Sequence, residues 1–155
     1  MNTATLNPSA ADQITQDQTA ILSLLEETSK AHRNKNARGI AALYTRDADI
    51  FNLAPPLVHR GIDLSEKQAW LDSWEGPVTI EPRDFQITVS GNSAFAHGYM
   101  RLSGKKKGAD QPVDFWMRET LCLERVSGDW RIVHEHSSVP FYMDGSLRPA
   151  FDLRP

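Results

Sequence analysis

The feature that most constrains the fold is a series of strand-like runs in the second half of the chain. Turn residues separate these runs: Gly91-Asn92, a glycine-bounded loop over 104–108, and Ser127-Gly128. Glycine and asparagine adopt the backbone angles that tight turns require, so runs separated this way pair as antiparallel neighbours. The sequence therefore predicts four consecutive antiparallel strands, over residues 78–90, 93–103, 113–125 and 130–139.

The first half of the chain has helical periodicity instead. Over residues 12–36, apolar residues recur every three or four positions and charged residues lie on the opposite side. A short helix is expected over 37–44 and a brief strand over 50–53. Asp63 can cap a third helix, with Glu66 as its reciprocal partner in a capping box. Helices followed by an antiparallel meander indicate an α+β fold, with the helices packed on one face of a curved sheet.

Length and charge limit the classes of protein to consider. A chain of 155 residues with 40% hydrophobic content is long enough to bury one core. The net charge is −3 and the only basic run is 105–107, which argues against a nucleic-acid partner. A single cysteine, Cys122, has no activating neighbour in sequence and suits a reducing compartment. No apolar run approaches the length of a membrane span, and the N-terminus has no secretory pattern, so a cytoplasmic protein without a membrane partner is expected.

Three segments are expected along the chain. Residues 1–11 are small and polar and are predicted to form a disordered arm. Residues 12–141 form the single domain. The proline-punctuated tail over 142–155 is predicted to wrap around the domain or a partner subunit.

A carboxylate stands out in the run over 113–125. Alternate side chains of a strand share one face, and Glu119 is the only charged member of an otherwise apolar face. Its apolar companions are Val113, Phe115, Met117, Leu121 and Leu123. A carboxylate in such surroundings needs a partner or serves as a site group. Two readings stay open: a salt bridge to a buried arginine such as Arg101, or a role in ligand binding.

Other candidate residues lie in the loops and on the helices. Asn52 and His59 flank the Pro55-Pro56 loop and either stabilise it or bind a ligand. Trp70 and Trp74, on the third predicted helix, are expected in the core or in a cavity wall. His134 and His136 either pack at an interface, face a cavity or bind a metal. Their spacing lacks the His-Glu-x-x-His pattern of zinc enzymes, so no metal is predicted.

Several strings resemble the SnoaL-like, ketosteroid-isomerase-like branch of the nuclear transport factor 2-like superfamily. They are Gly39–Ala48, Arg60-Gly61 before the third helix, and Gly128–His134 in the last strand. The resemblance spans about residues 14–141 and implies a cone-shaped fold, with about three N-terminal helices on a curved, mostly antiparallel sheet. Residues 130–134 are also similar to the last strand of the calcium/calmodulin-dependent kinase association domain, a non-catalytic hub.

The resemblance also implies which side chains share a cavity. The family's strand register places six residues beside Glu119: His97, Tyr99, Arg101, Val133, Glu135 and Ser137. At least two of His97, Tyr99, Arg101 and Glu135 are expected within hydrogen-bonding reach of Glu119 or of a ligand. The outer face of the sheet commonly forms the dimer contact in this superfamily. A homodimer is therefore expected, through Trp116, Arg118, His134 and His136.

The sequence departs from the steroid isomerases at their catalytic positions. Those positions fall on Thr28, Asn52 and Glu119 of this chain. The amide of Asn52 is not a base at neutral pH, so steroid isomerisation by the usual mechanism is not expected. Glu119 is the more conservative change, because a carboxyl in an apolar cavity stays neutral and donates a hydrogen bond.

The sequence thus predicts a small-molecule-binding protein that acts as an acid/base isomerase, dehydratase or cyclase on an apolar oxygenated metabolite. Glu119 or Glu135 is expected to transfer the proton, with His97 and Tyr99 as its partners and Arg101 tuning the charge. No nucleotide, flavin or haem motif is present, so no cofactor is predicted. The alternative is a non-catalytic ligand-binding or assembly module.

Overall fold

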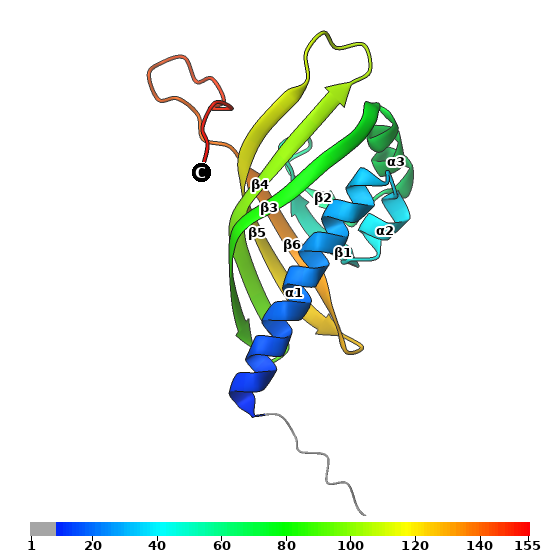
Figure 1. Ribbon diagram of the computed structural model, residues 1–155, viewed down its shortest axis with the longest axis vertical. Coiled ribbons are helices and arrows are strands. Elements are labelled where there is room, and N and C mark those ends of the chain that lie inside the picture. The colour runs from blue at the N-terminus through cyan, green and yellow to red at the C-terminus, as the bar shows by residue number, and fades with distance from the viewer. Residues whose placement is uncertain (1–8) are drawn as a thin grey trace, which may run out of the picture.

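A computed structural model describes residues 9–155 and shows helices packed against one face of a curved, unclosed sheet (Figure 1). The three helices and six strands that it describes run in this order: α1 (Ala10–Arg33), α2 (Ala37–Ala41), β1 (Tyr44–Phe51), β2 (His59–Arg60), α3 (Leu64–Asp72), β3 (Trp74–Ser90), β4 (Ser93–Lys106), β5 (Val113–Val126) and β6 (Asp129–Ser138). The α+β prediction is confirmed.

Strands β3 to β6 form the predicted antiparallel meander, and β1 completes the sheet beside β6. The order in the sheet is β2-β1-β6-β5-β4-β3 within the described residues. Strand β1 pairs parallel to β6 and antiparallel to the short β2, which the sequence did not predict. Strand β1 also begins at Tyr44, earlier than expected, because α2 ends at Ala41. This early start places Tyr44 on the sheet rather than on a helix.

Helix α1 starts earlier than predicted, at Ala10. Ser9 caps it in a capping box, because its side chain accepts from the Asp12 amide while the Asp12 carboxylate accepts from the Ser9 amide. The predicted disordered arm over 1–11 is therefore wrong for Ala10 and Ala11, which are helical. It is also wrong for Ser9, which caps the helix, and residues 1–8 lie outside the described residues.

The core fills the space between α1 and the inner face of the sheet. Its fully buried side chains include Ile21, Leu25, Leu123 and Ile132. Burying each such side chain contributes about 1.5–3 kcal/mol relative to leaving it in water. A second cluster, around Ile40, Leu71 and Val78, joins α2 and α3 to the start of β3. These two clusters fix the helices over the sheet and leave space between them.

The C-terminal tail folds back beside β5 of its own chain. The Phe151 ring lies 4.5 Å from the Phe115 ring, centre to centre, and Ala150 is buried. The Arg154 guanidinium donates to the Asp114 carbonyl at 3.3 Å. The tail thus contacts the domain, and a contact with a partner subunit stays a prediction. Between residues 9 and 155, no helix is both long enough and apolar enough to cross a bilayer.

Candidate ligand-binding site

A cavity of about 480 Å³ lies between the helices and the inner face of the sheet. Its walls come from α1, α3, β1, the loop before α3, and strands β3 to β6. Most of the wall is apolar, with Ile80, Met100, Leu102, Phe115 and Met117 as examples. A volume of this size and a mostly apolar lining with a few polar groups are typical of small-molecule sites.

Glu119 is a buried carboxyl in this cavity, with 4% of its surface exposed. It makes one side-chain hydrogen bond within the described residues, accepted by its Oε2 from the Ser137 hydroxyl at 2.8 Å. No cation pairs with it there. Burial, and then the charge of Glu135, raise the pKa of Glu119 well above its usual value, against a smaller opposite effect of Ser137. Glu119 is therefore a neutral acid at pH values where an exposed glutamate is ionised.

Glu135 is the second carboxyl of the cavity, on the neighbouring strand β6. Its Oε2 accepts a short hydrogen bond from the Tyr44 hydroxyl, which reaches it from β1. Burial, and then the charge of Glu135, raise the pKa of Tyr44 well above its usual value. The phenol therefore keeps its proton and holds Glu135 in place.

A β-bulge in β6 places Glu135 in the cavity. Two adjacent residues of β5, Cys122 and Leu123, pair with His134 and Ile132 of β6. Val133 therefore has no partner in β5 and is the extra residue of the bulge. Trp130 and Ile132 point into the core before the bulge, and Glu135 and Ser137 point into the cavity after it. Simple alternation along a regular strand would place these two pairs on opposite faces. That assignment is wrong because the bulge shifts the alternation by one residue.

His32 lies at the other end of the cavity, on α1. Its Nδ1 is 2.8 Å from the Thr28 carbonyl oxygen, which only accepts, so Nδ1 carries the hydrogen and Nε2 keeps its lone pair. Burial, and then the charge of Lys67, lower the pKa of His32 to about 3. His32 is thus a neutral imidazole and a hydrogen-bond acceptor.

Two lysines and two tryptophans surround this end of the cavity. Lys67 Nζ lies 4.9 Å from the centre of the Trp70 ring, and Lys106 Nζ lies 5.1 Å from the same centre. Lys106 Nζ also lies 4.2 Å from the centre of the Trp74 ring and donates to the Ser73 hydroxyl at 2.6 Å. Burial lowers the pKa of both lysines, and Glu135 opposes this effect at Lys67. The cavity thus has a cationic, aromatic end and an acidic end.

Residues 21–142 of this chain match the SnoaL-like domain family, which covers well over half of its length. The chain belongs to the SnoaL-like family. Its fold is similar to an NTF2-like protein of unknown function from Pseudomonas putida KT2440, with a TM-score of 0.78 and 29% identity over 91% of this chain and 98% of the other.

Two further structures resemble the SnoaL-like chain at lower identity. A candidate scytalone dehydratase from Novosphingobium aromaticivorans has a TM-score of 0.71 and 14% identity, over 90% of this chain and 97% of the other. A candidate ketosteroid isomerase from Shewanella frigidimarina has a TM-score of 0.62 and 22% identity, over 77% of this chain and 94% of the other. These identities support the fold alone. No curated protein matches the chain.

Three residues expected in the cavity of this SnoaL-like chain lie on the outer face of the sheet instead: His97, Tyr99 and Arg101. Gly98 is the partner of Glu119 across the β4–β5 ladder, and directly paired residues share a face. Arg101 forms a bidentate pair with Asp114, at 2.8 Å for both bonds, and so does not reach Glu119. The inward placement taken from the family register was therefore wrong by one position, as was the expected pairing of Glu119 with these side chains.

Position 98 has room only for a residue without a side chain. A Cβ atom at this position would lie 2.9 Å from the Arg83 carbonyl oxygen and 2.7 Å from the Phe85 ring. The register of β3 against β4 shifts between Arg83 and Gln86, where β3 bends over β4. Glycine therefore permits the close approach of the two strands opposite Glu119.

Four other predicted ligand-binding residues do line the cavity: Asn52, His59, Trp74 and Ser137. Asn52 uses its side-chain oxygen to accept from the Leu53 amide at 2.8 Å, and it lies near the loop that precedes α3. Trp74 is the first residue of β3 rather than part of α3, because α3 ends at Asp72. The Trp74 indole N–H is buried and has no hydrogen-bond partner in the described part of the chain.

The four residues predicted at the dimer interface are absent from the cavity wall. Trp116 lies against Arg83, whose guanidinium carbon is 5.5 Å from the ring centre, and Arg118 donates to Ser138 at 3.2 Å. His134 hydrogen-bonds to the Asp49 carbonyl at 2.8 Å, and its ring packs against Phe51, as does that of His136. The alternative that these histidines face the cavity is therefore wrong. Among residues 9–155, no group of three His, Cys, Asp or Glu side chains is placed to hold a metal ion.

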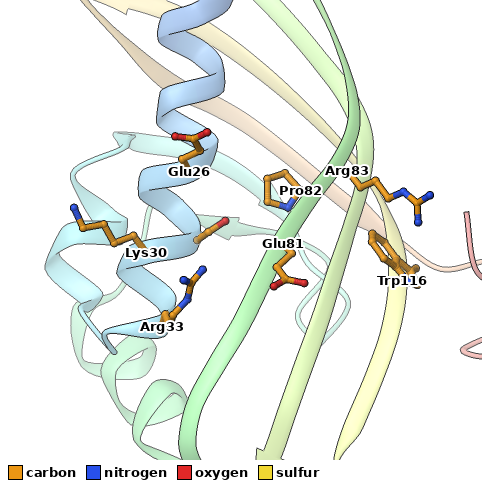
Figure 2. Close-up of a pocket in the computed structure, with 8 residues that line it drawn as sticks. Glu26, Lys30, Arg33, Glu81, Pro82, Arg83 and Trp116 are labelled. Carbon is orange, nitrogen blue, oxygen red and sulfur yellow. The ribbon is translucent and has the colours of Figure 1, made fainter.

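A second hollow lies on the surface between α1 and β3 (Figure 2). This groove measures about 570 Å³ and is lined by Glu26, Ser29, Lys30, Arg33, Glu81, Pro82, Arg83 and Trp116. Its charges pair with neighbours at the surface, such as Lys30 with Glu27 at 3.6 Å and Glu81 with Arg101 at 3.4 Å. Such exposed pairs are weak. The groove has no buried titratable group comparable to Glu119, so the cavity is the better candidate site.

Sequence reasoning missed four residues of the cavity wall, His32, Tyr44, Lys67 and Lys106, whereas Trp70 was expected in the core or in a cavity wall. Tyr44 was expected at the end of the helix over 37–44. It follows Ile40 by four residues, a spacing typical of one face of a helix, so nothing in this pattern indicated a strand there. Lys67 and Lys106 are far apart in sequence, and both reach the Trp70 ring only in the folded chain. The one usable signal was in β4 itself, where Ala94, Ala96, Gly98, Met100 and Leu102 form a small, apolar set that fits the inner face.

Proposed function

We propose that the cavity binds a small, apolar metabolite with a carbonyl group and catalyses acid/base isomerisation or dehydration. The observation that carries this proposal is the pair of carboxyls in one cavity with different partners. Glu119 is buried, lacks a cation and is held neutral, whereas Glu135 accepts from a tyrosine that remains protonated. Two carboxyls whose surroundings separate their protonation states are suited to act as acid and base.

The roles follow from these states. Glu135 accepts a proton from the carbon beside the carbonyl, and the electron pair moves onto the carbonyl oxygen. Glu119 donates a hydrogen bond to that oxygen and stabilises the developing enolate. Return of the proton to a different carbon completes an isomerisation. Departure of a hydroxyl group from the adjacent carbon, with a proton from Glu119, completes a dehydration. Each positioned acid or base typically contributes about 10²–10⁴-fold to such a rate.

The relatives support this class of reaction without fixing it. Structures of the same fold include a candidate scytalone dehydratase, a candidate ketosteroid isomerase and a candidate dehydratase from Streptomyces avermitilis. The steroid isomerase arrangement with a base at the position of Asn52 stays unexpected for this chain. Asn52 lines the cavity as an amide, and the proposed base is Glu135 on β6.

Exchange of carbonyl α-protons for deuterium tests the proposal without knowledge of the natural substrate. The probe is 2-tetralone in D₂O near neutral pH, followed by proton NMR. We expect exchange faster than in buffer, lost in Glu135→Gln and reduced in Glu119→Gln. The control variant His97→Ala changes an exposed residue of the outer face and should keep the wild-type rate.

An exchange rate equal to that of buffer, with the probe shown to bind, would contradict the catalytic proposal. The same result would favour the second candidate, a non-catalytic ligand-binding module. That candidate is supported by the mostly apolar wall and by the size of the cavity.

A further inference from the structure

Between residues 9 and 155, no carboxylate lies within 4.0 Å of either lysine at the aromatic end of the cavity. Lys67 Nζ forms neither an ion pair within 4.0 Å nor a hydrogen bond in the part of the chain that the structure describes, and it lies over the Trp70 ring. Lys106 Nζ has a neutral hydroxyl, Ser73, and the faces of Trp70 and Trp74. The two ammonium groups therefore lie at about the same distance from the Trp70 ring.

The carboxylates that share the cavity wall are engaged elsewhere or neutral. Glu135 accepts from Tyr44 and acts on Lys67 only from beyond ion-pair distance, and burial favours the neutral form of Glu119. Asp63 accepts from the Glu66 amide at 2.8 Å as the cap of α3, and Glu66 itself is exposed. An ammonium group that loses water without gaining an anion is costly in free energy. The observed arrangement is the one expected of a site whose anion arrives with the ligand.

We propose that the ligand is an apolar organic acid, whose carboxylate binds at the end of the cavity lined by Lys67 and Lys106 and whose carbonyl lies at Glu119. This inference rests on the proposed function only in taking the cavity as the ligand site. The flat faces of Trp70 and Trp74 and the side chains of Met100, Leu102 and Phe115 fit an aromatic or polycyclic body between the two ends.

A carboxylate fits this end better than a phosphate does. Phosphate sites commonly use arginine forks or a free helix N-terminus. No arginine lines the cavity, and the N-terminus of α3 is already capped by Asp63, with Glu66 in its first turn. These two acidic side chains repel a dianion more than a monoanion.

Three probes of one shape and different charge test the inference by titration calorimetry near neutral pH and low salt. They are 2-naphthoate, methyl 2-naphthoate and the 2-naphthylmethylammonium ion. We expect 2-naphthoate to bind about tenfold more tightly than the ester, since one charge-assisted hydrogen bond is worth about 1.5–3 kcal/mol. The ammonium probe should bind most weakly.

Substitutions of the lysines should remove this preference selectively. Lys67→Met keeps the apolar stem and removes the charge, so affinity for 2-naphthoate should fall about fivefold or more, while affinity for the ester stays unchanged. Lys106→Met should act in the same direction. The matched control is Lys105→Met, because Lys105 pairs with Glu75 at 3.1 Å and does not line the cavity. Lys67→Arg, which keeps the charge, should retain the preference and guards against an effect of folding alone.

The outcomes separate this inference from the proposed function. Equal affinity for naphthoate and ester, or equal effects of Lys67→Met and Lys105→Met, would overturn the inference. Preference for naphthoate without any α-proton exchange of 2-tetralone would leave the inference standing and reject catalysis. Failure of all three probes to bind would reject the cavity as the ligand site and both proposals with it.

Discussion

Two buried carboxyls, Asp17 and Glu119, lie at different ends of the interior and behave in opposite ways. Each is 4% exposed. Asp17 lies near the β5–β6 turn, where it forms a short ion pair with Arg125 and accepts from Gln13 at 3.2 Å and from the Trp130 indole at 3.4 Å. Among residues 9–155, the Glu119 carboxyl hydrogen-bonds only to the Ser137 hydroxyl.

The difference in partners reverses the direction of the pKa shift. Burial alone would raise the pKa of Asp17, but the hydrogen bonds from Arg125, Gln13 and Trp130 and the charge of Arg125 outweigh it and hold the pKa below its usual range. At Glu119 the hydrogen bond from Ser137 opposes the effect of burial only weakly, so the pKa of Glu119 rises. A buried carboxyl with a cation therefore belongs to the framework, whereas a buried carboxyl without one is available for chemistry.

The largest expected effect is the loss of stability in Asp17→Asn. The substitution keeps the shape and leaves Arg125 without its anion. Breaking a buried ion pair costs about 3–5 kcal/mol, and we expect about 2–3 kcal/mol here because Arg125 is partly exposed. Urea denaturation near pH 5 measures the free energy of unfolding.

Glu119→Gln is the matched control for that measurement. It replaces a neutral acid with a neutral amide that can still bond to Ser137, so we expect a change under about 1 kcal/mol near pH 5. A loss as large as that of Asp17→Asn would show that Glu119 is an ionised member of a structural ion pair, and the contrast between the two carboxyls would be lost.

The two carboxyls should also give stability opposite dependences on pH. The lowered pKa of Asp17 means that its contribution is full above its usual pKa of 3.8 and is lost as the pH falls through the folded-state value. The raised pKa of Glu119 means that stability declines as the pH rises above its usual pKa of 4.5, toward the folded-state value. Each proton changes the slope by at most about 1.4 kcal/mol per pH unit.

Unfolding curves collected from acidic to alkaline pH test this prediction. Asp17→Asn should lose part of the acid-side dependence, and Glu119→Gln should become more stable relative to wild type as the pH rises. Identical curves for wild type and Glu119→Gln above pH 4.5 would mean that the pKa of Glu119 is not raised.

Much of the fold could be predicted from the sequence, because its signals are local. The turns at Gly91-Asn92 and Ser127-Gly128 end the strands where expected, and Asp63 caps α3. The early start of β1 and the pairing of β2 were missed because both depend on contacts with residues distant in sequence. The parallel pairing of β1 with β6 is one of these contacts.

The site was predicted in part for the same reason. Glu119 interrupts an apolar alternation within one strand, so its inward face follows from β5 alone. The face of β4 depends on its register with β5, and that of β6 depends on the bulge at Val133, neither of which leaves a clear trace in sequence. Glu135 and Ser137 were placed correctly through the family register, which failed for His97.

A smaller change in stability is expected in Ser137→Ala, which removes the hydrogen bond from the Ser137 hydroxyl to Glu119. Since Ser137 lowers the pKa of Glu119, the variant should raise it further and lose about 0.5–1.5 kcal/mol of stability. Titration of ¹³C-labelled glutamate carboxyls by NMR reports the shift. The neighbouring Ser138→Ala is the control, because Ser138 accepts from Arg118 rather than bonding to Glu119. Equal titrations in the two variants would contradict a specific role of Ser137.

Substitutions on the outer face of the sheet should have the smallest effect on the opposite pKa shifts of Asp17 and Glu119. This face is the predicted contact of a homodimer. Phe95 and Tyr99 are 47% and 39% exposed on this face, where Tyr99 pairs with Arg118, and aromatic side chains with arginine favour interfaces. Light scattering after size exclusion should give about twice the chain mass of 17.4 kDa. A Trp116→Ala, Arg118→Glu variant should shift toward the monomer and leave the pH dependence due to Asp17 and Glu119 unchanged, because neither carboxyl lies on that face. A wild-type monomer at micromolar concentration would refute the dimer, and a changed titration of Glu119 in the variant would show that the outer face and the cavity are coupled.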